Sequence, residues 1–567
     1  MNMIENAKIQ INELLGKACK RAREAGALPG GAPLSGSIKI PRETTHGDYA
    51  ATHAMAAAKE LMMAPAIIAR ALVDNIELEG SYFGSVSIAG PGFINFTLSG
   101  KWFGEVLKTV EDMGDAYGAV DTGKGERVMV EFVSANPTGP MTIGNARGGV
   151  LGDTLASILQ RAGYDVWREF YVNDSGNQVE LFGRSIDARY MQLCLGEGNF
   201  AFPEDGYHGD DIKELAALIF EAEGDKLTTL PEHERAEKFI AFALPHNIAL
   251  MKEHLERYRI RFDEWFHESS LYKSGYIAET VELLEKCGLL YERDGALWLR
   301  NMDLGADKDE VLRRANGFYT YYAADIAYHR NKLARGFNKV IDVWGADHHG
   351  HAIRMKASFS SEALGKALDV NGEGLDFLIM QMVRLTRDGE TVKVSKRTGK
   401  ALTLNDLLDE ISVDACRFFF NAKPDSHLEF DLGLAVRQDS ENPVYYVQYA
   451  HARICSLLAM LASEGYDVPK YKEIASELLN SETELQLIKQ IAVLPEEIQL
   501  AARDYDPSRI NKYLIELAAR FHRFYDACRI KGEERPLLLA RLKLADTVRS
   551  VIRNCLGILG VTAPEKM

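Results

Sequence analysis

A short apolar run, followed by a proline- and glycine-rich loop and then by a helical pattern, constrains the fold of this chain most. Residues 127–133 (RVMVEFV) are rich in apolar and β-branched side chains, as a buried strand of a parallel sheet requires. From Asn145 to about Gly163 the pattern becomes helical, and residues 165–172 (DVWREFYV) predict a second strand. This order predicts a parallel α/β sheet that binds its ligands at the carboxyl ends of the strands.

Strand patterns recur later in the chain and extend this sheet. They return at residues 338–344 and 375–385, whereas the residues between about 173 and 300 are largely helical or irregular. We therefore expect a Rossmann-like domain over residues 119–440 that carries an insertion at about 173–300.

The two ends of the chain predict separate domains. An amphipathic N-terminal helix and a pair of alternating segments around a Gly-Pro-Gly turn within residues 85–98 predict an α+β domain over residues 1–118. After Asn442-Pro443 strand patterns almost vanish, which predicts an all-α bundle over residues 441–567. The chain is thus expected to be a multidomain α/β protein.

Charge and cysteine content exclude several classes of protein. A net charge of −16 argues against non-specific coating of membranes or nucleic acid, although residues 503–567 carry 13 Lys and Arg against 8 Asp and Glu. Seven scattered cysteines without a C-x-x-C pair support neither a disulfide framework nor a thiolate zinc site. No run of about 18 apolar residues predicts a membrane span. We expect a cytoplasmic protein.

The first segment that suggests chemistry is EFVSANPTGPMTIGNARGG, residues 131–149. It lies where the first predicted strand of the sheet gives way to a helix. The N-terminus of such a helix offers free N–H groups and a positive dipole end, which suit a triphosphate. A glycine-rich turn after a strand is also often only a tight connection.

The second segment is KVSKRTGK, residues 393–400, which follows an Asp388-Gly389 turn typical of a hairpin. Its lysines and Ser395 are suited to neutralising the charge that grows in a phosphoryl transition state, although a bare basic loop is the simpler reading. The two segments occur in one chain, the second some 250 positions after the first, and such a pair rarely arises by chance.

Together these segments resemble the HIGH and KMSKR signatures of class I aminoacyl-tRNA synthetases. They read Thr142-Ile143-Gly144-Asn145 and Lys393-Val394-Ser395-Lys396-Arg397. More specifically, the chain is similar to the arginyl-tRNA synthetases over nearly its whole length. The segments that carry this similarity are HGDYATHAMAAAK, AGPGFINFTL, SANPTGPM, YHGDDIKEL, FDEWFHESSLY, YYAADIAYH, WGADHHGH and NPVYYVQYAHARI.

This resemblance implies a function for each domain. Residues 1–118 correspond to the additional tRNA-binding domain, residues 119–440 to the catalytic domain and residues 441–567 to the anticodon-binding domain. The implied reaction is arginine–tRNA ligation, in which ATP converts arginine to arginyl-adenylate and tRNA(Arg) then accepts the arginyl group. AMP and pyrophosphate are released. Relatives often activate arginine only with tRNA bound, and we expect a monomer.

The resemblance also implies roles for individual residues. The two signatures imply that the catalytic residues are Thr142, Asn145, Lys393, Ser395, Lys396 and Arg397. The implied arginine-binding residues are Glu131, Ser134, Asn136, Tyr321, Asp325 and His349, among which a carboxylate suits the planar guanidinium. The implied ATP-binding residues are Pro137, Thr138, Gly139, Gly144, Asn145, Gly345, Asp347, His348 and Lys396.

Two features set this chain apart from the usual pattern. Thr142 and Asn145 replace both histidines of the first signature, so hydrogen-bond donors are kept but no imidazole charge is. The three histidines of ADHHGH do not predict a zinc site, because adjacent residues diverge and no second ligand cluster is evident. We expect no resident metal, and Mg²⁺ to enter with ATP.

Other functions remain compatible with these residues. A synthetase for another amino acid would share both signatures, and a small-molecule adenylyltransferase would share the phosphate-binding segment but have no obvious use for a long helical tail. The altered TIGN segment is also what a catalytically inactive tRNA-binding paralogue would carry.

Overall fold

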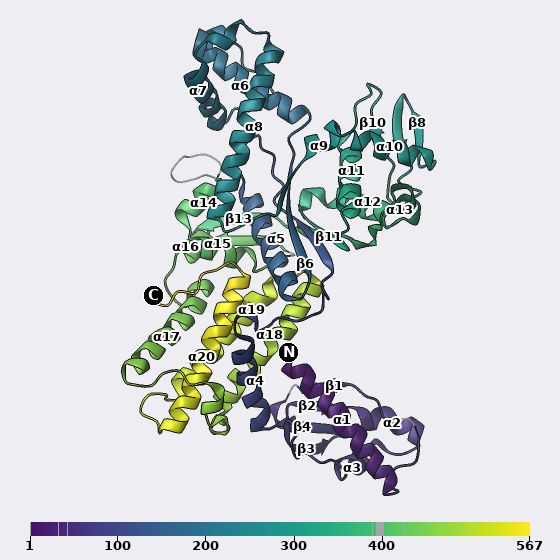
Figure 1. Cartoon of the computed structure of the whole chain (residues 1–567), viewed down its shortest axis with the longest axis vertical. Coiled ribbons are helices and arrows are strands. Elements are labelled where there is room, and N and C mark those ends of the chain that lie inside the picture. The colour runs from purple at the N-terminus through teal and green to yellow at the C-terminus, as the bar shows by residue number, and fades with distance from the viewer. Residues whose placement is uncertain (1, 32, 42, 388, 393–401, 425) are drawn as a thin grey trace.

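The computed structural model of this chain describes residues 2–31, 33–41, 43–387, 389–392, 402–424 and 426–567. The molecule is elongated (Figure 1). The N-terminal domain forms one end, a helical insertion forms the other, and the parallel sheet and the C-terminal bundle lie between them (Figure 1).

The N-terminal domain packs three helices on an antiparallel sheet of strand order β1-β2-β4-β3. Strands β3 and β4 pair from Phe83↔Leu98 to Ala89↔Phe93, on either side of the Gly-Pro-Gly turn, as predicted. The elements are α1 (Met3–Glu24), β1 (Ile38–Lys39), β2 (Tyr49–Ala51), α2 (His53–Leu61), α3 (Pro65–Val73), β3 (Phe83–Ala89) and β4 (Phe93–Leu98).

Five parallel strands form the central sheet in the order β12-β11-β5-β6-β7. The predicted β-loop-α-β unit is confirmed, since one buried helix connects two neighbouring parallel strands. The members of the sheet and this helix are β5 (Arg127–Glu131), α5 (Ile143–Arg161), β6 (Asp165–Val172), β7 (Glu264–His267), β11 (Lys339–Gly345) and β12 (Leu375–Met380).

Strand β7 lies inside the stretch that we expected to be a single insertion. It pairs with β6 through Val172↔His267, so the chain returns to the sheet and leaves it again. The part before β7 is helical and consists of α6 (Asn177–Leu195), α7 (Asp210–Glu223) and α8 (Glu232–Arg257). The part after it contains α9 (Glu268–Lys273), α10 (Tyr276–Lys286) and the antiparallel strands β8 (Leu290–Arg293), β9 (Ala296–Leu299) and β10 (Glu310–Arg313).

Two further groups of elements complete the central region. Helix α11 (Tyr321–Ala334) precedes β11, and α12 (His349–Ser360) and α13 (Glu362–Leu368) follow it. A small sheet beside the main one pairs β13 with β14 in the predicted hairpin and with β15 in parallel. Its elements and helices are β13 (Val383–Arg387), β14 (Glu390–Thr391), α14 (Leu404–Glu410), α15 (Val413–Phe420), β15 (Leu428–Asp431) and α16 (Leu432–Ala435).

The C-terminal bundle begins where the sequence predicts, since the Asn442 side chain accepts from the Val444 N–H and Pro443 is the first helical residue. Its helices are α17 (Pro443–Ser463), α18 (Glu482–Asp504), α19 (Ser508–Ala527) and α20 (Arg535–Ile558). Helix α4 (Gly100–Met113), which follows the N-terminal sheet, packs against α18 and α20.

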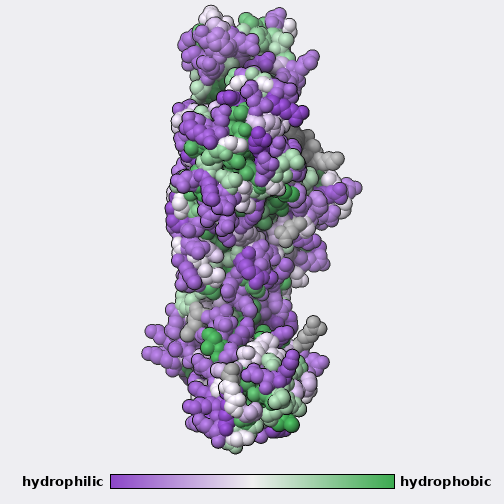
Figure 2. Space-filling view, turned by 90° about the vertical axis from the view of Figure 1, so that its right-hand side faces the viewer, coloured by the Kyte–Doolittle hydropathy of each residue, from purple (hydrophilic) through white to green (hydrophobic). Residues whose placement is uncertain are grey.

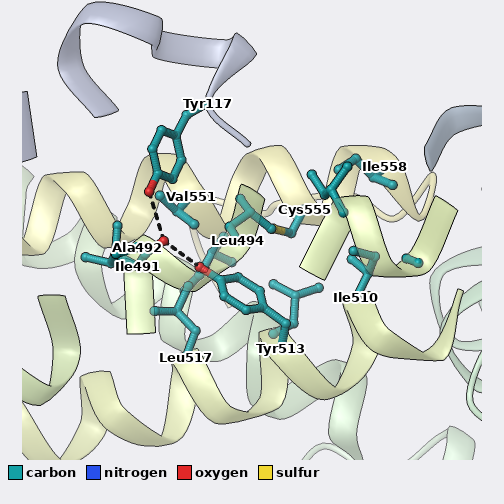
Figure 3. Packing of buried hydrophobic residues seen from close by; sticks show 14 of the residues in the cluster. Tyr117, Ile491, Ala492, Leu494, Ile510, Tyr513, Leu517, Val551, Cys555 and Ile558 are labelled. Carbon is teal, nitrogen blue, oxygen red and sulfur yellow. Dashed lines mark hydrogen bonds between the residues drawn. The ribbon is translucent and has the colours of Figure 1, made fainter. Parts of the chain in front are cut away.

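Buried side chains attach the bundle to the catalytic region. Tyr117 lies in the bundle core and donates to the Ile491 carbonyl at 2.9 Å, and the Tyr513 hydroxyl reaches the same oxygen at 3.4 Å (Figure 3). Arg417 on α15 is fully buried; it donates to the Leu559 carbonyl at 2.7 Å and pairs with Asp153 on α5. The helix that carries the first signature is thus joined to the end of the bundle.

Among the described residues, no helix combines the length and the apolar character that a membrane span needs. The face of the molecule shown in Figure 2 is mostly hydrophilic, with apolar patches scattered between polar residues.

Candidate active site

A cavity of about 1090 Å³ opens at the carboxyl ends of the central strands. Its wall includes Glu131 at the end of β5, Tyr171 on β6, Trp344 and Gly345 at the end of β11, and Met380 at the end of β12. The cavity therefore lies at the edge at which open parallel sheets bind their ligands, where the sequence predicts a binding site.

The loop after β5 forms one wall and turns sharply. Val133 and Ser134 have φ values of 70° and 42°, in the left-handed region that L-residues rarely adopt, which is costly for a β-branched valine. The Ser134 hydroxyl donates to Glu131 Oε1 at 2.6 Å and accepts from the Tyr171 N–H at 3.3 Å. The strained backbone is therefore held by hydrogen bonds to both neighbouring strands.

Helix α5 begins at this loop with a capping box. Thr142 accepts from the Asn145 N–H at 3.3 Å, while the Thr142 N–H and hydroxyl both donate to Asn145 Oδ1 at 2.8 Å. The two residues that replace the histidines of the signature thus bind each other and define the start of the helix. Both line the cavity together with Gly144, so the positive end of the helix dipole faces the space.

The chain that follows the second signature lies beside this helix start. The Leu404 N–H donates to the Met141 carbonyl at 2.9 Å, and Thr403 and Asp406 form a second capping box at the start of α14. The start of α5 is therefore linked to the described chain that follows the second signature, through an isolated bridge between Thr142 and Thr403.

A buried network of charged groups lies under the cavity. Lys332 contacts Glu131 Oε2 and donates to Asp342 Oδ1 at 2.7 Å, and all three side chains are at most 4% exposed. Burial raises the pKa of the Glu131 carboxyl, and the charge of Lys332 opposes this shift. Burial also acts on Asp342, but Lys332 and a hydrogen bond from His329 outweigh it and hold its pKa below the ordinary value.

Asp325 is the acid on the opposite wall, contributed by α11. Its Oδ2 lies 2.7 Å from Nε2 of His351, and its side chain is 25% exposed, against 4% for Glu131. Aromatic rings surround this pair: Trp344 stacks on His351 at 5.4 Å between ring centres, and Tyr321 lies 5.6 Å away. The wall therefore offers a carboxylate in a largely aromatic frame.

Most of the residues that the resemblance implies lie around this one cavity. They are Glu131, Ser134, Asn136, Thr138, Gly139, Thr142, Gly144, Asn145, Tyr321, Asp325, Gly345, Asp347 and His348. Pro137 lies outside the lining, and its carbonyl accepts from Asn247 on α8 at 2.8 Å. Lys393, Ser395, Lys396 and Arg397 lie outside the described residues.

His349 is the one histidine of ADHHGH whose implied place differs from the structure. It is exposed and begins α12 outside the lining, whereas His348 and His351 line the cavity. The turn at the end of β11 continues directly into a helix, and this directs neighbouring side chains apart. In the described part of the chain no group of three or more His, Cys, Asp or Glu side chains could hold a metal ion.

Sequence reasoning missed several lining residues. Tyr207, His208 and Asp211 come from the helical insertion, and Tyr328, His329, His351 and Arg354 come from α11 and α12. The segments YHGDDIKEL and YYAADIAYH carry part of the family resemblance, but the sequence does not predict which of their side chains point into the cavity.

Comparison with protein families divides the chain into three matched regions. Residues 9–98 match the arginyl tRNA synthetase N terminal domain, residues 110–431 the class I (R) tRNA synthetase catalytic domain, and residues 447–567 the DALR anticodon binding domain.

Individual relatives agree with these matches. The chain is 50% identical to an arginine–tRNA ligase of Acetivibrio thermocellus and 48% identical to one of Caldanaerobacter subterraneus, with full coverage of both proteins in each case. A structure of a protein described as an arginyl-tRNA synthetase from Campylobacter jejuni is 35% identical, with a TM-score of 0.75 over 83% of this chain and all of that one. The Thermus thermophilus arginyl-tRNA synthetase, 21% identical, shares the fold with a TM-score of 0.72 over 98% of this chain and 99% of its own. From its family matches, its relatives and its fold, this chain belongs to the arginyl-tRNA synthetase family of class I aminoacyl-tRNA synthetases.

Proposed function

We propose that the cavity at the carboxyl edge of the central sheet is where this arginine–tRNA ligase joins arginine to AMP. The observation that carries this proposal is Asp325, a partly exposed carboxylate on the wall of a cavity that also contains a helix N-terminus. A carboxylate suits a guanidinium, and a helix N-terminus suits a phosphate. The two substrates thus have complementary groups in one space.

The ATP end of the cavity is proposed to lie between the start of α5 and the turn after β11. The Gly144 N–H and the side-chain amide of Asn145 are proposed to face the phosphates, while Gly345, Asp347 and His348 are proposed to lie beside the nucleoside. Lys393, Lys396 and Arg397 of the second signature are proposed to neutralise the pyrophosphate, with Ser395 as a hydrogen-bond donor. Mg²⁺ is proposed to enter with ATP, where oxygen donors such as the exposed Asp347 carboxylate match its ligand preference.

The reaction follows in two steps. The carboxylate of arginine attacks the α-phosphorus of ATP, and pyrophosphate leaves with the electron pair of the broken P–O bond. The terminal ribose hydroxyl of tRNA then attacks the carbonyl carbon of arginyl-adenylate, and AMP leaves. Neither step needs a covalent enzyme nucleophile, so the cavity contributes positioning and electrostatic stabilisation.

Recognition of tRNA(Arg) is proposed to involve both ends of the molecule, with the C-terminal bundle contacting the anticodon. On α17 the rings of Tyr445 and Tyr449 stack at 6.3 Å, and Tyr449 is 42% exposed. Arg453 on the same helix lies over Tyr525 at 4.1 Å. Exposed aromatic and cationic groups of this kind can stack on unpaired bases.

We propose that the enzyme acts as a monomer, with one copy of the chain sufficient for the reaction.

The test is aminoacylation of total bacterial tRNA with ATP, Mg²⁺ and each labelled amino acid in turn. Charging with arginine alone, and only with ATP, supports the proposal. Charging with another amino acid would assign the cavity to a different substrate. No charging with any amino acid, despite measurable tRNA binding, would identify an inactive paralogue.

A further inference from the structure

Two acids face the proposed arginine site, and the structure separates their roles. Both oxygens of Glu131 have protein partners, Ser134 at 2.6 Å and Lys332 on the other side. Lys332 is fully buried and also donates a hydrogen bond to Asp342. The negative charge of Glu131 is therefore largely compensated before any substrate arrives.

His329 links this network to the backbone of Asp325. Its Nε2 lies 2.7 Å from the carboxylate oxygen Oδ2 of Asp342, and its Nδ1 lies 2.7 Å from the Asp325 carbonyl oxygen. A carbonyl oxygen only accepts hydrogen bonds, and so does an ionised carboxylate. These two contacts therefore hold the ring of His329 between the Asp342 side chain and the backbone carbonyl of Asp325.

Asp325 differs because it has no lysine or arginine partner among the described residues. Its Oδ2 accepts from His351, and no hydrogen bond within the described chain engages its Oδ1. It is also the more exposed of the two acids. A guanidinium that enters the cavity thus finds an uncompensated carboxylate at Asp325.

His351 is placed to orient this carboxylate. Its side chain is 10% exposed, with Trp344 stacked on one side and the edge of Tyr322 at 5.3 Å. Nε2 donates to Asp325, whereas Nδ1 is buried and has no partner among the described residues. Among the described residues, the contact with Oδ2 of Asp325 is therefore the one hydrogen bond of this ring.

We propose that His351 and His329 are positioning residues for Asp325, the first holding its side chain and the second its backbone carbonyl, so that one carboxylate oxygen remains free for the guanidinium of arginine. This proposal rests on the proposed function. It predicts that removing the His351 donor weakens arginine binding and spares ATP binding, because the hydrogen bond acts on the arginine end only.

The test compares wild-type enzyme with H351A, H351Q and a control, H246A, in tRNA charging at varied arginine and at varied ATP. His246 lies on α8, beside Phe242 and outside the cavity lining. H351A is expected to raise the KM for arginine about tenfold or more and to leave the KM for ATP within about twofold, as loss of a hydrogen bond to a charged group implies. H351Q, which keeps a donor of similar reach, is expected to restore most of the loss.

Two further readouts separate positioning from simple loss of structure. H351A should also lower the selectivity for arginine over citrulline, its neutral analogue, as an inhibitor of charging, while the melting temperature and the tRNA affinity stay near wild type. H329A should raise the KM for arginine as well, because the backbone carbonyl of Asp325 loses its partner.

Either of two results would overturn the inference: an unchanged KM for arginine in H351A, or an equal rise in the KM values for arginine and for ATP. If wild-type enzyme fails to charge tRNA with arginine, the proposed function fails instead, so the two failures are distinguishable.

Discussion

Replacing Lys332 by methionine tests the buried network beneath the active site. Lys332 is fully buried and is the cation between Glu131 and Asp342, which are 4% and 0% exposed. Removing one partner of a buried ion pair leaves an uncompensated charge and typically costs about 3 to 5 kcal/mol. In K332M two acids lose the same partner, so the loss in free energy of unfolding should be at the upper end of that range.

Urea unfolding followed by tryptophan fluorescence is a suitable assay, because Trp167, Trp265, Trp298 and Trp344 all lie in the central region. The matched control is K366M, which breaks a lysine–carboxylate pair with Glu362 whose side chains are 75% and 81% exposed, and which should cost less than about 0.5 kcal/mol. K332M/E131Q should recover a large part of the loss, since one of the two acids becomes neutral. Equally small losses of unfolding free energy in K332M and K366M would show that Lys332 does not compensate two buried charges.

Three further predictions concern the pH dependence, the second signature and the cap of α5. Burial raises the pKa of Glu268 to about 7, so its contribution to stability is present at low pH and is lost as the pH rises through that value. The side chain of E268Q does not titrate, so between pH 5 and pH 8 this variant should gain about 2 to 3 kcal/mol in free energy of unfolding relative to wild type. Parallel curves of unfolding free energy against pH, measured by urea unfolding, would contradict this. K396A should abolish arginyl-adenylate formation, as followed by arginine-dependent exchange of labelled pyrophosphate into ATP with tRNA present, and wild-type turnover would exclude a charge-stabilising role for Lys396. T142A removes the capping box with Asn145 and should destabilise the enzyme by about 1 kcal/mol in urea unfolding, whereas T142S, which keeps the hydroxyl, should remain close to wild type.

Local patterns were sufficient to predict the regular elements. The β5-α5-β6 unit, the β3–β4 hairpin and the start of α17 at Pro443 follow from apolar periodicity, turn residues and helix caps, all of which act within a few residues. Strand β7 was not predicted. It has only four residues, and its pairing with β6, nearly a hundred positions earlier, is what makes it a strand.

The buried charges could not be predicted for a related reason. Lys332, Asp342, Arg147 and Arg417 belong to residue types that usually face water, and only their distant partners explain why they are buried. The same limit applied to the histidines after β11, because the sequence could not tell which of three neighbouring rings turns towards Asp325. The structure selects His351.

A crystal structure with arginine and a non-hydrolysable ATP analogue would show where both substrates bind. We predict a guanidinium against the free oxygen of Asp325, with the His351 contact to Oδ2 kept and the phosphates at the start of α5 near Gly144. A guanidinium bound away from Asp325, or a nucleotide bound outside this cavity, would contradict this prediction.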